Sequence, residues 1–372
     1  MLKENKAEVS SAEYRPSIIE SWGERKILYF FNKVDAGNKP LSLVFIMRMG
    51  IILSFFVGFV ITIMIALIEI YFFPEIDEFS TNIYGFSIYA IVSILLIFSE
   101  FYLLFLLGFY CVAHLIKISG VDYNLYEMRL SLSRAILEIP EPKTSRFNLD
   151  LTKYRRRSYY LSLILYKVKN LASNFIAKII FKQLLARTSF RAYSALIAAP
   201  ITGFWDALVM GLTLKEAHSR ISARICVMRL LDCMSDSEKM DDDLIEILFR
   251  ITAIRIELNG GYDASLDYFL LGLFERYESV YLNISDISSV GVLKNLLSVS
   301  MHSNSGEIKS ITTLLFSIKN KNLTQHEIYF IQELDITLAQ INILRKEVLS
   351  FKGLESLSTG DSEEIQLDML RS

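Results

Sequence analysis

Four side chains that can carry a charge, a proton or a hydrogen bond recur along one long apolar stretch of the sequence. The stretch runs from about Asn82 to Ile116 and is interrupted only by Glu100 and His114. At 100° per residue along a helix, the four positions fall within about 60° of one another. An ionised carboxylate that faces lipid costs several kcal/mol, so Glu100 must face protein or water, pair with a cation or keep its proton. The predicted polar stripe, lining a pore or lying inside the membrane, consists of Ser93, Glu100, Cys111 and His114.

Two interpretations of Glu100 are open. It is either a structural acid near the inner membrane interface, paired with Arg48 or solvated, or one member of a ring of carboxylates. The ring forms if several copies of the chain place this stripe around a common axis. Because two helices cannot enclose a pore, the ring requires at least a trimer and favours about four or five subunits.

Two apolar segments are long enough to position these side chains across a bilayer. The first, between Arg48 and Glu69, has twenty uncharged residues, which measure about 30 Å as a helix. The second reaches about 50 Å as one helix, so it has to tilt or continue beyond the membrane. We predict spans at about 49–69 and 83–116, within a transmembrane hairpin of residues 43–118.

Charges around the hairpin predict its orientation. The loop between the two spans carries three acids and no Lys or Arg, whereas both flanks are basic. By the positive-inside rule, both termini are expected in the cytoplasm. The flanking basic residues are Lys33, Lys39, Arg48, Lys117, Arg129 and Arg134.

Small residues recur every four positions in the first span. Such a ridge lets another helix approach closely and gain dispersion contacts that lipid tails do not outcompete. We predict that it is a helix-packing surface, which we call the small-residue ridge. Its members are Ser54, Gly58, Thr62 and Ala66.

A basic region follows the hairpin. Residues 151–205 contain ten Lys or Arg and no Asp or Glu, and we predict basic juxtamembrane amphipathic helices over 119–205. Three uses remain open: a helix on the anionic inner leaflet, a buried bundle helix with a solvated basic edge, or a site for a nucleotide or oligonucleotide. The residues predicted to bind lipid or an anionic ligand are Arg155, Arg156, Arg157, Lys167, Lys169, Lys178, Lys182 and Arg187.

The rest of the sequence is acidic, with 25 Asp or Glu against 16 Lys or Arg from Asp206 onward. The apolar run that leads into this region is broken by Pro200, Gly203 and Asp206. These breaks favour a core helix of a cytosolic domain over a third span, and a re-entrant element is the alternative. Asp206 is predicted to be a paired structural acid. We expect an acidic helical cytosolic domain at 206–353, a cytosolic N-terminal segment at 1–42 and a mobile tail at 354–372.

Near the end of this domain, Thr324 and Glu327 have the spacing of a helix capping box. Apolar residues at helical spacing follow, and the next glycine after them is Gly353. The pattern predicts one long helix that ends at Gly353.

No enzyme signature is found in the sequence. There is no Walker A loop, GxGxxG or GxSxG motif, and the three cysteines form no CxxC pair. The histidines have no partner at metal-ligand spacing; they are His114, His218, His302 and His326. We therefore predict no catalytic residue, no metal and no cofactor.

Two segments carry a resemblance. SRAILEIPEP (133–142) and ALIAAPITGFWDALVM (195–210) look like an uncharacterised bacterial membrane-protein family that has two N-terminal spans and a helical cytosolic part. The layout is also similar to that of membrane effectors in bacterial antiphage defence systems, which are paired with a nucleotide-producing enzyme. The resemblance implies a bacterial inner membrane location and a nucleotide or oligonucleotide as a cytosolic ligand.

Together these patterns predict an all-α integral membrane protein with a two-helix hairpin and a helical cytosolic domain. The leading function is an oligomeric ion channel or pore-type effector that a cytosolic ligand or partner gates. The alternative is a membrane-anchored scaffold whose hairpin only tethers an interaction domain. The expected partners are further copies of the chain and anionic lipids of the inner leaflet.

Overall fold

The computed structural model describes residues 16–35, 42–72, 83–120, 126–137, 191–236, 242–259, 263–277, 290–318 and 323–348. Within these ranges the chain is helical apart from short turns and caps, and no strand is present. The predicted all-α class is therefore confirmed for the part of the chain that is described.

Helices α3 (Leu43–Phe72) and α4 (Ile83–Ser119) form an antiparallel pair, and both are long and apolar enough to cross a membrane. We call the end with Leu43 and Ser119 the base of the pair and the opposite end the tip. Near the base, a Cβ added at Gly50 would lie 2.9 Å from Sγ of Cys111. Near the tip, the hydroxyl of Tyr89 donates to Oε2 of Glu69 at 3.1 Å.

The two halves of α4 have different surroundings. The helix has 37 residues, which corresponds to about 55 Å and exceeds the thickness of a bilayer core. Its exposed large hydrophobic side chains lie between Ile91 and Leu103, whereas its side chains from Phe109 to Ile116 include many that are fully buried. The excess length predicted for this segment is thus a continuation of the helix into a protein core.

Two short helices cover the base half of α4. In α2 (Ile18–Asp35), Trp22 packs edge-on against Phe109 of α4, with ring centroids 5.4 Å apart. α5 (Tyr126–Leu137) is joined to α2 by an ion pair in which Nε of Arg134 donates to Oε1 of Glu20 at 2.7 Å. The exposed fractions of these two side chains are 3% and 0%, so the pair is shielded from water.

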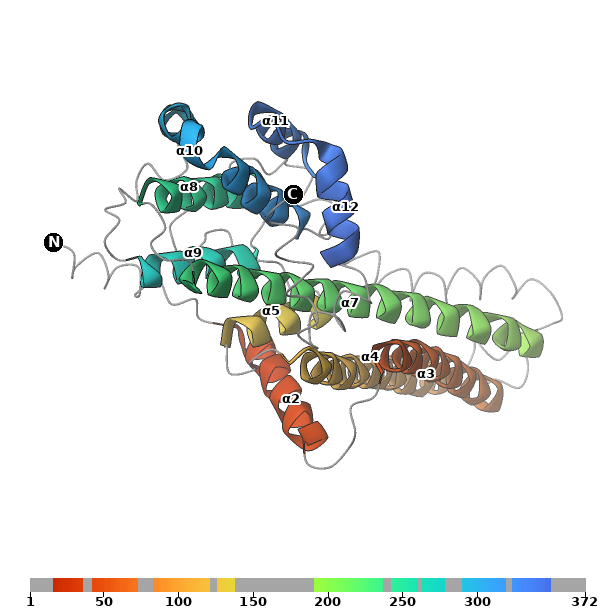
Figure 1. Cartoon of the computed structure of the whole chain (residues 1–372). Coiled ribbons are helices and arrows are strands. Elements are labelled where there is room, and N and C mark those ends of the chain that lie inside the picture. The colour runs from red at the N-terminus through yellow and green to blue at the C-terminus, as the bar shows by residue number, and fades with distance from the viewer. Residues whose placement is uncertain are drawn as a thin grey trace.

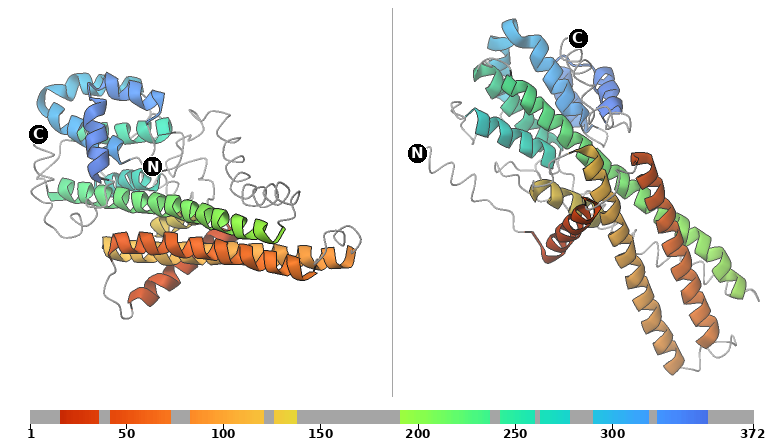
Figure 2. Two further views of the ribbon diagram at one scale, coloured as in Figure 1. Left: turned by 90° about the vertical axis from the view of Figure 1, so that its right-hand side faces the viewer. Right: turned by 60° about the horizontal axis from the view of Figure 1, so that its bottom comes forward.

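α7 (Arg191–Asp236) is a single helix of 46 residues, about 69 Å long. Figures 1 and 2 show it in green, running from the tip of the α3–α4 pair past the base and into the C-terminal helices. Its first half packs along α3 rather than in the core of the C-terminal helices. The helix continues without a break through residues 205 and 206, where the sequence predicts a domain boundary.

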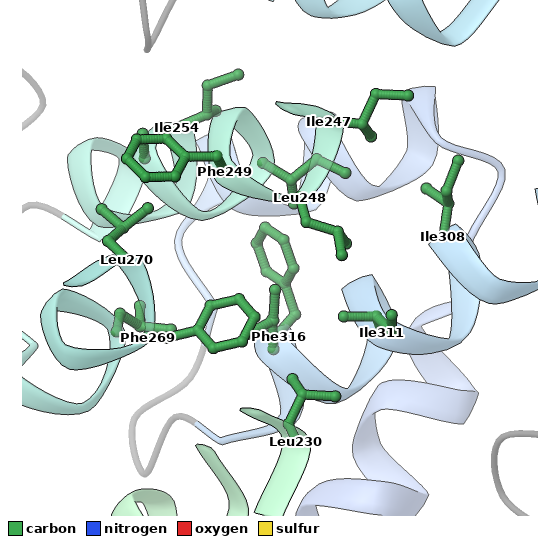
Figure 3. Close-up of a cluster of buried hydrophobic side chains, with 14 of the residues drawn as sticks. Leu230, Ile247, Leu248, Phe249, Ile254, Phe269, Leu270, Ile308, Ile311 and Phe316 are labelled. Atoms are coloured by element: carbon green, nitrogen blue, oxygen red, sulfur yellow. The ribbon is translucent and has the colours of Figure 1, made fainter. Parts of the chain in front are cut away.

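The C-terminal helices form a second core with the last turns of α7. They are α8 (Asp242–Asn259), α9 (Ala264–Arg276) and α10 (Val290–Ser317), and apolar side chains from all of them converge with Leu230 of α7 (Figure 3). α9 is also tied to α7 by polar contacts: Nη1 of Arg276 donates to the carbonyl of Leu231, and the hydroxyl of Tyr277 donates to the carbonyl of Met234 at 3.0 Å. The labelled members of this core are Leu230, Ile247, Leu248, Phe249, Ile254, Phe269, Leu270, Ile308, Ile311 and Phe316.

The last described segment contains two helices where one was predicted. The capping box is present, because Thr324 accepts from N of Glu327 and Glu327 accepts from N of Thr324. However, α11 (Gln325–Glu333) stops at a turn in which Asp335 has a positive φ of 57°, and α12 (Leu338–Val348) begins after it. The prediction of one continuous helix to Gly353 is therefore wrong.

A first core at the base joins α2, the base ends of α3 and α4, α5 and α7, and we call it the base core; it includes Ile27, Leu43, Phe109, Leu132 and Leu214. His218 gives this core a pH dependence. It lies in α7 between Ala217 and Ile221 of that core, is 3% exposed, and burial lowers its pKa from 6.5 to about 4. The folded chain therefore keeps this imidazole neutral while the unfolded chain takes up a proton below about pH 6.5. We expect the unfolding free energy to fall by about 3 kcal/mol from this group as the pH drops from about 6.5 to about 4.

Chemical denaturation in a mild detergent across this pH range measures the loss. A His218→Leu variant lacks the titrating group, so its unfolding free energy should fall less than that of the parent chain over the same range. An equal fall in both proteins contradicts the assignment.

Candidate functional site

Exposed apolar side chains gather on three helices. Large hydrophobic residues are exposed on α3 from Val44 to Tyr71, on the tip half of α4, and on the first half of α7 from Ile201 to Leu212. We call this surface the apolar belt. Continuous apolar surface of this kind is rare on water-soluble monomers and marks contact with lipid or with another chain. Elsewhere in the described residues, large hydrophobic side chains are exposed only at Ile18, Ile19, Tyr29, Tyr329 and Ile343.

α3 and α7 cross at a point where both helices carry glycine. A Cβ added at Gly203 of α7 would lie 2.5 Å from the carbonyl oxygen of Phe55. A Cβ added at Gly58 of α3 would lie 3.3 Å from Cα of Gly203 and would overlap the carboxylate of Asp206. The two backbones are therefore in direct contact, and Gly58 leaves the space that the Asp206 carboxylate occupies.

Asp206 and Glu100 lie at the same height along the bundle. Along α4, Glu100 is midway between Cys111, which contacts Gly50, and Tyr89, which bonds to Glu69. Its height on α3 is thus midway between residues 50 and 69, which is where Gly58 contacts Asp206. Both carboxylates are buried, with exposed fractions of 1% for Glu100 and 2% for Asp206.

We call these two acids the carboxylate layer. Hydroxyl groups accompany it on α3, where Ser54 and Thr62 are buried one turn to either side of Gly58. The layer lies near the middle of α3, since Gly58 is almost central in Leu43–Phe72. Carboxylates buried at the same depth as hydroxyl oxygens can bind or pass a cation or a proton.

The structure separates the members of the predicted polar stripe. Glu100 is buried in the carboxylate layer and Ser93 is half-buried on the tip side of it. Cys111 and His114 lie in the base core instead, with exposed fractions of 0% and 3%. There Cys111 lies against α3, with Sγ 4.0 Å from the carbonyl of Ile46, and His114 packs edge-on to Tyr110. These two side chains are enclosed within one chain.

The small-residue ridge faces α7 at Gly58, and Ser54 and Thr62 are buried while Ala66 is half-buried. The partner of the ridge at this point is thus a helix of the same chain.

The residues predicted to bind lipid or an anionic ligand lie outside the described residues. These residues are Arg155, Arg156, Arg157, Lys167, Lys169, Lys178, Lys182 and Arg187. The predicted tail at 354–372 also lies outside the described residues.

α7 brings the carboxylate layer and both cores into one element. Asp206 belongs to the layer, Leu214 and Ile221 to the base core, and Leu230 to the core of the C-terminal helices. A displacement of α7 along its axis therefore moves Asp206 relative to Glu100. Sequence reasoning treated Asp206 as a structural acid and did not connect it with Glu100.

Comparison of the chain with protein-family models, with curated proteins and with solved structures finds no match. The resemblance of residues 133–142 and 195–210 to a two-span membrane-protein family therefore stays a prediction. Among the described residues, no group of three or more His, Cys, Asp or Glu side chains is placed to hold a metal ion.

Proposed function

We propose that α3, α4 and the first half of α7 are inserted in a bacterial inner membrane, and that the chain assembles into a cation channel or pore-type effector gated from the cytosol. The observation that carries the proposal is the carboxylate layer. It places two acids from different helices, Glu100 and Asp206, at one height in the middle of helices with an apolar outer surface.

The energetic cost of these acids favours a functional role. An Asp at the centre of a membrane helix costs about 2.5–3.5 kcal/mol on insertion scales, and acids kept at that depth commonly mark ion or proton paths. An apolar residue at either position would pack between helices without this cost. Since three helices of one chain cannot enclose a water-filled pore, the path requires several copies of the chain.

The apolar belt supports insertion of the first half of α7 beside α3 and α4. Residues 192–214 contain one charged side chain, Asp206, and the exposed residues of α7 from Ile201 to Leu212 continue the belt of α3. This stretch corresponds to about 35 Å of helix, enough to cross the hydrocarbon core. The length of this run and its exposed apolar side chains therefore favour a third span or a re-entrant element over a purely cytosolic helix.

The orientation in this proposal places the base of the bundle in the cytoplasm. α2, α5 and α8–α12 all lie at or beyond the base. Lys33, Arg48 and Lys117, which flank α3 and α4, lie there too, as the positive-inside rule requires for these two helices. Leu137 at the end of α5 is then on the cytosolic side, and Arg191 at the start of α7 is on the outer side. Anionic lipids of the inner leaflet contact the basic flanks.

Gating in this proposal uses α7. A ligand that binds the C-terminal helices in one of two packings changes the position of α7, and Asp206 moves with it. The size of the effect is limited by the difference in ligand affinity between the two packings. The ligand class implied by the antiphage resemblance is a nucleotide or oligonucleotide.

Neutralising the carboxylate layer tests the proposal. We expect purified protein in planar bilayers to give discrete cation-selective conductance, and Glu100→Gln and Asp206→Asn each to reduce cation preference, because a fixed negative charge in the path attracts cations. The reversal potential under a salt gradient measures the preference. The matched control is Glu216→Gln, an acid of α7 that is ion-paired to Arg220 at 3.1 Å and lies about 15 Å along the helix from Asp206 toward the base.

Two results contradict the channel. One is a silent bilayer under all gating conditions, including after removal of the C-terminal helices, and the other is a monomer or dimer in detergent. Either result favours the alternative, a membrane-anchored scaffold. One observation favours the scaffold: Cys111 and His114 are buried inside one chain, so only Ser93 and Glu100 of the predicted polar stripe remain along the proposed path.

A further inference from the structure

The outer side of α2 combines exposed apolar side chains with cations. Outside the apolar belt, three of the five large hydrophobic side chains that are exposed among the described residues belong to this helix: Ile18, Ile19 and Tyr29. The exposed fraction is 86% for Ile18 and 56% for Tyr29. The cations Arg25 and Lys33 are exposed on the same helix. A helix surface that is both apolar and basic is typical of contact with a membrane surface.

Most of these residues share one side of the helix. At 100° per residue, five positions between residues 18 and 33 fall within about 80° of one another. The opposite side, with Gly23, Ile27 and Val34, is buried. We call the exposed side the outer face of α2. Its members, of which Trp22 is half-buried and the others are exposed, are Ile18, Trp22, Arg25, Tyr29 and Lys33.

The charges of α2 are separated between its two sides. Two acids of α2 have side chains that the structure describes, and both are paired with arginines of α5: Glu20 with Arg134 at 2.7 Å, and Glu24 with Arg129 at 3.1 Å. No acid among the described residues is ion-paired with a cation of α2. The outer face is therefore positively charged, which favours an anionic partner. The cations of α2 are Arg25, Lys33 and, at the edge of the outer face, the half-buried Lys26.

The outer face of α2 is continuous with the apolar belt. The ring centroids of Trp22 and Tyr102 are 6.2 Å apart, and Tyr102 is an exposed residue of α4 near the base end of the belt. Figure 1 shows α2 running obliquely to α3 and α4. α2 therefore lies across the helix at the place where the apolar surface of α4 ends.

The position of α2 along α4 corresponds to the inner edge of the bilayer in the proposed orientation. With the carboxylate layer at the bilayer centre, the edge of the hydrocarbon core lies about 15 Å, or ten residues, toward the base. This edge is near Tyr110 on α4 and near the exposed Arg48 on α3. Phe30 of α2 packs edge-on against Tyr110, with ring centroids 5.8 Å apart, and the carbonyl of Val34 accepts from Nζ of Lys117 at 3.0 Å. α2 therefore crosses α4 at the depth of the lipid headgroups.

We infer that α2 is an interfacial helix whose outer face docks on anionic phospholipid headgroups of the inner leaflet. Its cations contact the lipid phosphates, while Ile18, Trp22 and Tyr29 reach the boundary of the acyl chains. Tryptophan and tyrosine are enriched at this depth in membrane proteins. A second copy docked through the same face would instead bring like charges together. The inference rests on the proposed insertion of α3, α4 and the first half of α7.

The first measurement locates α2 relative to the bilayer. The chain has two tryptophans, so Trp205→Phe leaves only Trp22, and Trp22→Phe leaves only Trp205. Each full-length variant is reconstituted in vesicles of phosphatidylglycerol and phosphatidylcholine whose acyl chains carry bromine at one known depth. We expect the shallowest bromine to quench the fluorescence of Trp22 most. Trp205 adjoins Asp206 of the carboxylate layer, so the deepest bromine should quench it most.

The two tryptophans separate this inference from the proposed function. Quenching of Trp205 by deep bromine, without quenching of Trp22 at any depth, overturns the docking of α2 and leaves the insertion standing. A second copy that covers α2 predicts this result. Strongest quenching of Trp22 by the deepest bromine also overturns the docking, because the cations would then lie below the headgroups. No quenching of either tryptophan overturns the insertion and the docking with it.

The second measurement tests the cations. Because Ile27 on the buried side of α2 belongs to the base core, lipid bound to the outer face should raise the melting temperature of the full chain. In a neutral maltoside detergent, we expect short-chain phosphatidylglycerol to raise the melting temperature more than phosphatidylcholine of the same chain length. Combining Arg25→Gln with Lys33→Gln should weaken the apparent affinity for phosphatidylglycerol by at least about tenfold.

The matched control removes two surface cations from the C-terminal helices. Combining Lys309→Gln on α10 with Lys346→Gln on α12 makes the same change in net charge and should leave the affinity for phosphatidylglycerol unchanged. An equal response of the parent chain to the two lipids overturns the docking. An unchanged affinity after replacement of Arg25 and Lys33 overturns it too, and so does an equal loss of affinity in the two double variants.

Discussion

Replacement of Arg134 by methionine is expected to lower the unfolding free energy by about 3–5 kcal/mol, because it leaves a buried carboxylate without its cation. Arg134 donates to Glu20 at 2.7 Å where both side chains are almost fully buried. The pair holds α2 against α5, so its loss also opens the cover of the base half of α4. Chemical denaturation in a mild detergent, followed by the circular dichroism of the helices, measures the effect.

The same pair provides its own control. Combining Arg134→Met with Glu20→Gln removes the unmatched charge. The glutamine can still accept the hydrogen bond that the backbone N of Ser17 donates to Glu20 at the start of α2. The double variant should therefore recover most of the lost free energy. Arg129→Met, which removes the more exposed pair with Glu24, should cost less than about 1 kcal/mol. A small effect of Arg134→Met contradicts the shielding of the pair.

The helices whose pattern is local could be predicted from the sequence. The two apolar helices were predicted because uninterrupted apolar length is itself the signal, and both exist with ends within a few residues of the predicted hairpin limits, 43 and 118. The capping box at Thr324 was predicted because it depends on two residues three positions apart. The break after α11 was missed, since the turn at Asp335 interrupts a run whose apolar spacing continues into α12.

The place of α7 could not be predicted from its hydropathy. Pro200, Gly203 and Asp206 weaken its apolar signal. Gly203 and Asp206 are explained only by partners in space, because they lie against α3 at Phe55 and Gly58. One signal was available. Gly203, Ala207 and Gly211 recur every four residues, which is the same small-residue spacing as the ridge of α3. Matching the two ridges would have paired the helices and placed Asp206 in the bundle.

The candidate site illustrates the same limit. Glu100 was found because an acid in an apolar helix is conspicuous in the sequence. That Asp206 lies at the same height depends on how three helices are aligned, which the sequence of one helix does not show. Cys111 and His114 share its helical face yet lie in the base core, because α2, α5 and α7 cover that half of α4. Side chains on the same face of a helix can therefore have different surroundings when the helix is longer than a membrane is thick.

Replacement of Gly58 by leucine is expected to separate α3 from α7 and to lower the unfolding free energy by about 3 kcal/mol or more. A Cβ at this position meets the carboxylate of Asp206, and it lies 3.3 Å from the backbone of Gly203, which cannot rotate away as a side chain can. Intrinsic helix propensity favours leucine over glycine by roughly 0.8–1.0 kcal/mol. A destabilised variant therefore reports the crossing of the two helices and not a local preference.

Alanine substitutions at two glycines sharpen this test, because the same chemical change should have opposite signs. Gly58→Ala places its Cβ against Asp206 and should destabilise the bundle, whereas a Cβ at Gly211 lies 3.5 Å from Cδ1 of Ile51, an ordinary contact. Gly211→Ala should stabilise it by about 0.5–1 kcal/mol. Combining Gly58→Ala with Asp206→Ala removes the obstructing carboxylate and should restore stability, so the two sites should be coupled in a double-mutant cycle. Additive effects at Gly58 and Asp206 would show that α7 does not cross α3 at this point, and the carboxylate layer would lose its second acid.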